Sequence, residues 1–209
     1  NNTAKNNSGG ALCIGAHNTD KLDYLDVHNN TALWYGGGIY INNSTTEGTL
    51  TNSKIYNNTT SRAGGGVDIH NYLDFQETKV NNATVITRTG RPGDFTIRDC
   101  EISGNSTTGT DGNSIGGGGI SITSDLRRSE LYKEKSGTVN IIDTVVEDNT
   151  TTLAGGGIYC GYNGTNNISG GSISNNTSGT AATTAIDATN KYKYSGGAVA
   201  VRNNTTTIK

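Results

Sequence analysis

The chain is 209 residues long, carries a formal net charge of −2, and is 31% hydrophobic, with 30 Gly, one Pro and no Met. A helical bundle is excluded, because the apolar residues are mainly β-branched, and such side chains lose rotamer freedom in a helix but fit a pleated strand. The near-neutral charge gives no basis for attraction to nucleic acid, and no apolar run is long enough to cross a membrane. The chain shows no initiator Met and no signal peptide, which predicts a processed chain or a segment cut from a longer one.

One motif recurs six times in chain order: two glycines, a small residue, an apolar residue, any residue, and a second apolar residue. Each copy predicts a short strand, with glycines where the chain turns a corner. Repeats of this kind are typical of solenoids, in which each unit buries its apolar face against its neighbours. The copies begin at Gly9, Gly36, Gly64, Gly117, Gly155 and Gly196.

A second motif, apolar-x-x-Asn, lies upstream of five of the six Gly-Gly copies, and a further short apolar strand precedes it. One unit is therefore expected to hold three short strands. An inward asparagine at a turn can hydrogen-bond the backbone and the equivalent asparagines above and below it. The predicted structural ladder contains Asn30, Asn58, Asn105, Asn149 and Asn176.

The spacing of the Gly-Gly motif predicts the domain organisation. The first two intervals are 27 and 28 residues, and the later ones are longer, which indicates a minimal unit of about 27 residues with loops inserted into it. We expect one domain over residues 1–209, with solvated insertions near 71–94, 125–137 and 179–194.

The paired motifs resemble the GGA(I/L/V) and FxxN repeats of chlamydial polymorphic outer-membrane proteins and related β-helical surface adhesins, with Ile or Val here in place of the Phe. The resemblance covers nearly the whole chain. The motifs predict an all-β fold, a parallel β-helix (solenoid) of about six coils with three short strands per coil, and the resemblance implies that this β-helix is right-handed. It also implies an extracellular or cell-surface location and an adhesive role.

A catalytic site on the Gly-Gly strands would need acidic side chains at their outward positions. Asp68 is the one carboxylate expected there, whereas a glycosidase needs two facing carboxylates. Asp68 lies near Arg62 and His70 in sequence, but we disfavour a catalytic role for this group. No catalytic residue, metal site or cofactor is expected, and the widely spaced Cys13, Cys100 and Cys160 are expected to be free thiols.

Asn-x-Ser/Thr sequons occur at 16 of the 27 asparagines. Two explanations stay open: the sites carry N-linked glycans, or Asn and Thr co-occur because both suit turns. If glycans are present, the acceptors should point outward. The candidates are Asn29, Asn43, Asn57, Asn82, Asn163 and Asn175.

These patterns favour an extracellular structural or adhesive protein, either a surface adhesin segment or a subunit of a head-to-tail fibril. Its expected partners are second copies of itself or surface glycans. The sequence begins and ends within a coil, at positions where a second copy could continue the same coil. A segment cut arbitrarily from a longer β-helix would also begin and end within a coil. The alternative is a polysaccharide-binding or polysaccharide-cleaving β-helix that resembles pectate lyases. An ice-binding face is disfavoured, because no Thr-x-Thr motif recurs in register.

Overall fold

The computed structural model describes residues 1–15, 21–43, 47–71, 75–81, 83–88, 93–110, 115–124, 137–161, 164–179, 196–202 and 205–209. These residues form strands, turns and bends, and no helix. The protein is therefore all-β across the described part of the chain, as the composition predicted.

The strands stack as four parallel sheets, which we label A to D. Sheet A contains β1 (Thr3–Ala4), β5 (Thr31–Ala32), β9 (Thr59–Thr60), β15 (Ser106–Thr107) and β19 (Thr150–Thr151). Sheet B contains β2 (Leu12–Gly15), β6 (Ile39–Asn43), β10 (Val67–Asn71), β16 (Ile120–Ser124), β20 (Ile158–Cys160) and β23 (Val199–Val201). Sheet C contains β3 (Lys21–Asp23), β7 (Gly48–Thr51), β13 (Phe95–Arg98), β17 (Thr138–Ile142), β21 (Thr165–Ser169) and β24 (Thr205–Ile208). Sheet D contains β4 (Asp26–His28), β8 (Lys54–Tyr56), β14 (Glu101–Ser103), β18 (Val145–Glu147) and β22 (Ser172–Ser174).

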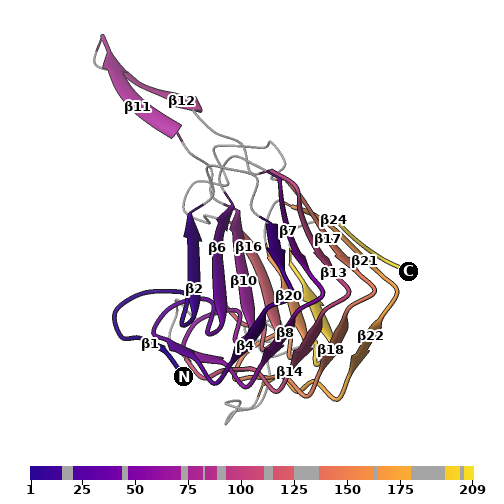
Figure 1. Cartoon of the computed structure of the whole chain (residues 1–209). Helices are drawn as coiled ribbons and strands as arrows, with labels where there is room; N and C mark the ends of the chain where they lie inside the picture. Colours follow the sequence, from indigo (N-terminus) through magenta and orange to yellow (C-terminus); the bar gives the residue numbers. More distant parts are fainter. Residues whose placement is uncertain are drawn as a thin grey trace.

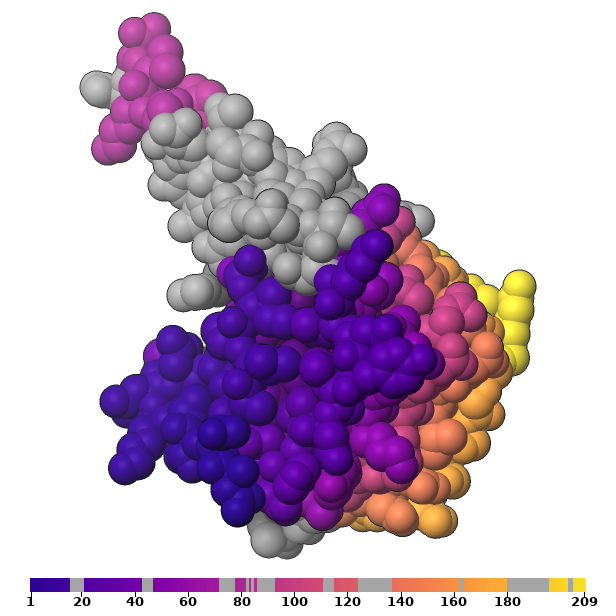
Figure 2. Space-filling model, in the orientation of Figure 1, coloured from indigo at the N-terminus to yellow at the C-terminus, as the bar shows by residue number. Residues whose placement is uncertain are grey.

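The chain visits the sheets in the order A, B, C, D and then returns to A, and we call one such passage a repeat. Figure 1 shows the strands of each sheet side by side, coloured in sequence from indigo to yellow, with the two termini at opposite ends of the stack. The space-filling view shows the same progression as successive bands of colour (Figure 2). This arrangement is consistent with a parallel β-helix.

Five repeats contain four short strands each, rather than the three expected from the sequence, and the last repeat has only β23 and β24 among the described residues. The strand that the motifs missed belongs to sheet A and is two residues long, as in β9 and β19. It consists mainly of Thr and Ser and carries no apolar alternation, so hydrophobic periodicity could not reveal it.

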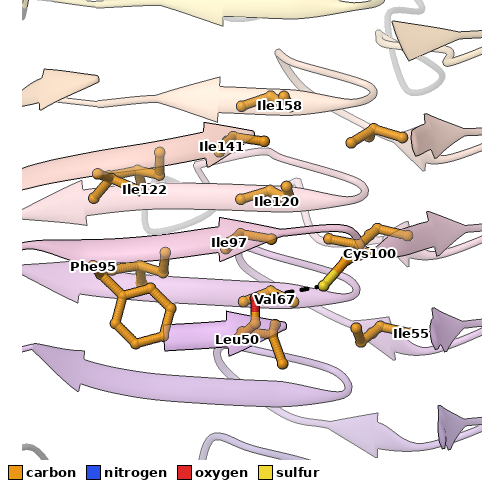
Figure 3. Close-up of a cluster of buried hydrophobic side chains, with 14 of the residues drawn as sticks. Leu50, Ile55, Val67, Phe95, Ile97, Cys100, Ile120, Ile122, Ile141 and Ile158 are labelled. Carbon is orange, nitrogen blue, oxygen red and sulfur yellow. Dashed lines mark hydrogen bonds between the residues drawn. The ribbon is translucent and has the colours of Figure 1, made fainter. Parts of the chain in front are cut away.

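The inward side chains form in-register apolar columns that fill the space between the sheets (Figure 3). The first apolar residue of each Gly-Gly motif pairs with its equivalent in the next repeat, which confirms the predicted column. Phe95 and Ile97 of β13 pack against the same core. The predicted column consists of Leu12, Ile39, Val67, Ile120, Ile158 and Val199.

The glycines of the repeated motif have two separate structural requirements. Gly64 has a φ of 64°, in the left-handed region that favours glycine. The next residue, Gly65, has no room for a side chain, because a Cβ there would lie 2.3 Å from the carbonyl oxygen of Gly118 in the following repeat. At the third position, a Cβ on Gly66 would lie 3.0 Å from Nδ2 of Asn105. The glycines of the motif are therefore required because the backbones of successive repeats lie too close together for side chains at these positions.

An antiparallel hairpin of β11 (Phe75–Val80) and β12 (Ala83–Arg88) lies within the insertion expected near 71–94. It projects away from the stacked sheets (Figure 1). The other two expected insertions, near 125–137 and 179–194, lie almost wholly outside the described residues.

Candidate functional site

A continuous ladder of asparagine side chains runs inside the corner between sheets D and A. Asn58 shows the pattern: its Oδ1 accepts hydrogen bonds from the backbone N–H and the Nδ2 of Asn30, at 3.0 and 2.9 Å. Its own Nδ2 donates to Oδ1 of Asn105 at 3.0 Å and to the carbonyl of Val27 at 2.9 Å. The same side-chain contact joins Asn30, Asn58, Asn105, Asn149 and Asn176.

The ladder has one more member than the sequence predicted, and this asparagine lies one repeat before Asn30. Asn2 donates from its backbone N–H and from its Nδ2 to Oδ1 of Asn30, each at 2.9 Å. The available signal was the residue that follows, since Asn2 precedes Thr3 as Asn30 precedes Thr31 and Asn58 precedes Thr59. The ladder is a structural element, because its amide groups are bonded to one another and to the backbone.

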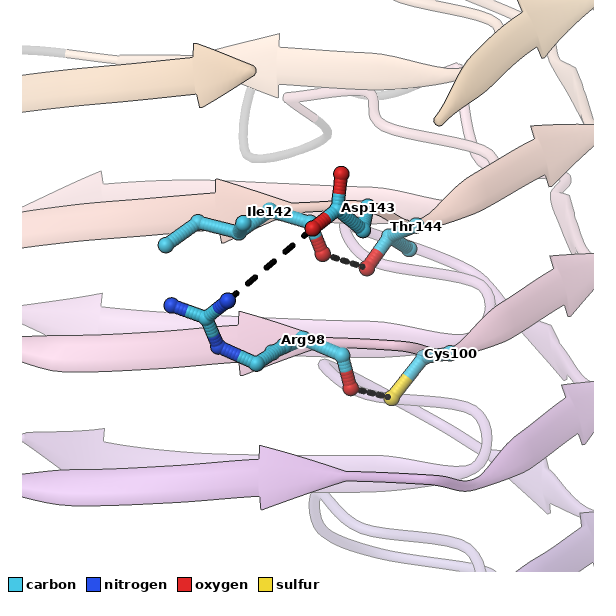
Figure 4. A network of polar contacts seen from close by, with 5 residues as sticks. All are labelled: Arg98, Cys100, Ile142, Asp143 and Thr144. Carbon is cyan, nitrogen blue, oxygen red and sulfur yellow. Dashed lines mark hydrogen bonds and ion pairs between the residues drawn. The ribbon is translucent and has the colours of Figure 1, made fainter. Parts of the chain in front are cut away.

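A second internal column lies at the corner between sheets C and D. Ser53, Cys100 and Thr144 each donate to the backbone carbonyl two residues earlier, at 2.6, 3.2 and 2.9 Å. Figure 4 shows the last two of these contacts, together with the ion pair between Arg98 and Asp143 at 3.9 Å on the outer surface. Cys100 thus takes the place of a hydroxyl residue in a structural column.

Three of the glycan-acceptor candidates occupy equivalent outer positions, each immediately before a ladder asparagine. Asn29, Asn57 and Asn175 are exposed and have φ values of 54–55°. Of the other three, Asn43 is the last residue of β6, and Asn82 and Asn163 lie outside the described residues. The structure therefore separates the exposed corner asparagines from the neighbouring ladder asparagines, whose side chains are engaged.

Asp68 takes the outward position expected of it but is buried. It alternates with the core residues Val67 and Ile69 and so faces away from the core, yet its exposed fraction is 0%. Among the described residues, neither carboxylate oxygen has a hydrogen-bond partner of good geometry, and the same holds for Oγ of Ser121, which is the nearby residue in the next repeat. Burial raises the pKa of Asp68 well above its ordinary value of 3.8, and the Ser121 hydroxyl acts in the opposite direction. The pairing pattern of a single strand could not predict this burial.

The described contacts of the sequence neighbours Arg62 and His70 are with aromatic residues and with Thr123. The Arg62 guanidinium lies over the rings of Trp34 and Tyr35, at 5.1 and 5.9 Å from their centroids. The His70 ring lies 5.9 Å from that of Tyr35 and bonds Oγ1 of Thr123 through Nδ1 at 2.9 Å. These contacts are those of an aromatic and basic cluster at the corner between sheets A and B.

A groove of about 300 Å³ lies over sheet A beside this cluster. Its sides are two outward columns, since residues two apart on a strand share a face. One column contains Thr3, Thr31 and Thr59, and the other contains Lys5, Leu33, Ser61 and Thr108. Sequence reasoning missed this surface, although a Thr or Ser follows every ladder asparagine.

The three cysteines are free thiols, with Cys13 exposed and Cys100 and Cys160 buried. Burial raises the pKa of Cys160 to about 12 and also raises that of Cys100. Within the described residues, no three His, Cys, Asp or Glu side chains are grouped so that they could hold a metal ion. The described part of the chain also contains no helix long and apolar enough to cross a membrane.

The chain matches no protein-family model, and searches of curated proteins and of solved structures give no significant match.

Proposed function

We propose that the protein is an extracellular structural and adhesive module, built as a right-handed parallel β-helix of about six coils in which each repeat is one coil. It serves as a surface adhesin segment or as a subunit of a fibril. The observation that carries this proposal is the repetition of one set of contacts along a single axis, most clearly the asparagine ladder from Asn2 to Asn176. Right-handedness follows from the resemblance of the motifs to chlamydial surface-protein repeats.

The last repeat supports stacking on a further coil. Val201 and Ile208 continue core columns whose preceding members, Cys160 and Ile168, are buried, yet they are 49% and 58% exposed. A further coil, from the same polypeptide or from a second copy, would cover both side chains and pair the open strand edges. Burying a fully exposed side chain of this size contributes about 1.5–3 kcal/mol, so covering these half-exposed side chains contributes about half of that each.

A non-enzymatic role is supported by the positions of the acidic residues. Asp68 has no second carboxylate in register with it, since its neighbours on β6 and β16 are Tyr40 and Ser121. Hydrolysis of a glycosidic bond needs an acid and a second carboxylate that acts as base or nucleophile. The cleaving alternative is tested by incubating the purified chain with pectin and other polysaccharides and measuring new reducing ends and unsaturated products; turnover would contradict the proposal.

Stacking is tested with the purified 209-residue chain by light scattering over a range of concentrations and by negative-stain microscopy. We expect the mean mass to rise with concentration and filaments one molecule wide to appear, because a head-to-tail contact does not close. A monomer at every concentration would contradict the fibril form.

Glycosylation is tested on material from the native source or from a secreting eukaryotic host. We expect glycans at the exposed corner positions Asn29, Asn57 and Asn175, and none on folded protein at Asn58 or Asn105. The measurement is intact mass before and after enzymatic deglycosylation, followed by peptide mapping. A mass of 21.8 kDa alone would contradict this part of the proposal.

A further inference from the structure

The groove over sheet A has the shape and chemistry of a site for an extended polymer. We propose that it binds one chain of an anionic polysaccharide, laid along the stack, with acidic groups against Lys5 and Arg62 and a sugar ring against Trp34. This inference rests on the proposed adhesive function and names the class of ligand. It adds a binding surface that the structural role does not require.

The direction of the groove follows from the repeat. Its lining takes residues from four successive repeats, at Thr3, Thr31, Thr59 and Thr108. The groove therefore runs parallel to the axis of the stack. Paired strands lie about 4.8 Å apart, which is close to the length of one pyranose unit in an extended polysaccharide. Each successive sugar would meet the same pair of outward positions, so a regular polymer fits this surface better than a compact ligand.

The side chains on the two edges differ in kind. The hydroxyl column includes Thr3, Thr31 and Thr59, which suits hydrogen bonding to sugar hydroxyls. Opposite them lies Leu33, which is 43% exposed and offers an apolar contact for the C–H face of a sugar ring. A mixture of apolar contacts with a few polar groups is typical of small-molecule sites in proteins.

The positive charges in and beside the groove favour an anionic polymer as the ligand. The described lining residues include one cation, Lys5, and no carboxylate. Arg62 directly follows the lining residue Ser61, and within the described residues neither Lys5 nor Arg62 has a carboxylate partner. One cation in the lining and a second on the residue next to it are complementary to uronate carboxylates or sulfate esters.

Trp34 provides an aromatic surface at the edge of the groove. It follows the lining residue Leu33 and is 37% exposed. The Arg62 guanidinium lies 5.1 Å from its ring centroid, so the cation and the ring are already held together. The Arg62 guanidinium and the Trp34 ring therefore lie together next to the groove, where the cation and the exposed part of the ring can contact one acidic sugar.

The test measures binding of the full chain to polygalacturonate, dextran sulfate and neutral dextran by isothermal titration. We expect at least one acidic polymer to bind about tenfold more tightly than neutral dextran, with affinity falling as salt is added. Preference for polygalacturonate identifies carboxylates as the ligand groups, and preference for dextran sulfate identifies sulfates. Equal binding of all three polymers, or binding of none, would overturn the proposal.

Matched variants locate the site. Lys5→Ala/Arg62→Ala should weaken binding of the acidic polymer by about tenfold. The control Lys21→Ala/Arg98→Ala removes the same charge from sheet C and should change the affinity by less than about twofold. Trp34→Ala should weaken binding, whereas Tyr24→Ala, which removes an exposed ring elsewhere, should not. Equal losses in both charge pairs would show general polyanion attraction and overturn the assignment.

The polysaccharide-binding test can fail while the test of stacking succeeds, and the reverse. Stacking is measured without polysaccharide, so filaments can form while the groove binds nothing. Conversely, release of products from the polymer would contradict the non-enzymatic role while leaving the groove as its binding site. Melting temperatures of all four variants confirm that each one folds.

Discussion

The Nδ2 of Asn58 donates to Oδ1 of Asn105 at 3.0 Å, although the two residues are 47 positions apart in the chain. The equivalent bond from Asn30 to Asn58 spans 28 positions and measures 2.9 Å. The intervening chain differs in length, yet the contact is the same. The ladder therefore fixes the register between repeats independently of the connections.

Replacing a central ladder residue should destabilise the protein strongly. In Asn105→Ala, the backbone N–H and Nδ2 of Asn58 lose their acceptor, and the carbonyl of Ile55 loses a donor. Unsatisfied buried polar groups cost about 1–3 kcal/mol each, so we expect a loss of about 3 kcal/mol or more in the free energy of unfolding. Urea denaturation measures it.

The control for this variant is Asn57→Gly. Asn57 is exposed with a φ of 54°, and the equivalent position of the next repeat is Gly104. Because glycine accepts this conformation, the free energy of unfolding should change by less than about 1 kcal/mol. A similar loss in both variants would mean that the corner, and not the ladder, determines stability.

Adding one methyl group at the second motif glycine should prevent close stacking. In Gly65→Ala the new Cβ would lie 2.3 Å from the Gly118 carbonyl oxygen, so the repeats must separate. We expect a loss of about 1–3 kcal/mol or more in the free energy of unfolding, or failure to fold. Gly15→Ala is the comparison, because a Cβ there meets nothing within 4 Å. Thermal melts showing equal stability for both would contradict the packing explanation.

Asp68 should make stability depend on pH. Its pKa is raised in the folded state, so between 3.8 and that raised value the folded protein holds a proton that the unfolded chain has released. The free energy of unfolding should therefore fall as the pH rises through this window, by up to about 1.4 kcal/mol per pH unit, and the effect is absent below it.

Asp68→Asn does not titrate and should remove this slope, which raises stability at neutral pH relative to the parent chain. Urea titrations at several pH values between 4 and 8 measure it, and Asp26→Asn controls for the change in net charge. A parent chain whose stability rises over this range would show that Asp68 is ionised in the folded protein.

Much of the stack was predictable from the sequence because each repeat makes the same contact again. The apolar column through Val67 and Ile120 and the asparagines of the ladder could be read from spacing alone. The strands of sheet A could not, because two residues such as Thr59 and Thr60 carry no periodicity.

The outer faces were harder to predict for a different reason. Burial of Asp68 depends on what lies over the sheet, and the strand pattern of β10 specifies only which face a side chain takes. The groove likewise exists only once Thr31 and Thr59 are in register. Local sequence determines each repeat, whereas surface chemistry arises from the alignment of several.

The thiols should react in an order set by burial. We expect one equivalent of a thiol reagent to react with native protein at Cys13, and all three cysteines to react after unfolding, since Cys100 and Cys160 are buried with raised pKa values. Absorbance of released thionitrobenzoate counts them. Rapid labelling of three thiols in the native state would contradict the placement of Cys100 and Cys160.

The β11–β12 hairpin leaves the stack after β10, and the chain rejoins it at β13 with the pairing of both strands intact. An insertion at this junction can therefore vary in length without changing the pairing of the strands on either side of it. The sequence of the exposed insertion between β10 and β13 can therefore change while the stacked sheets keep the same fold. The same junction offers protein engineers a place to graft foreign peptides onto a rigid rod.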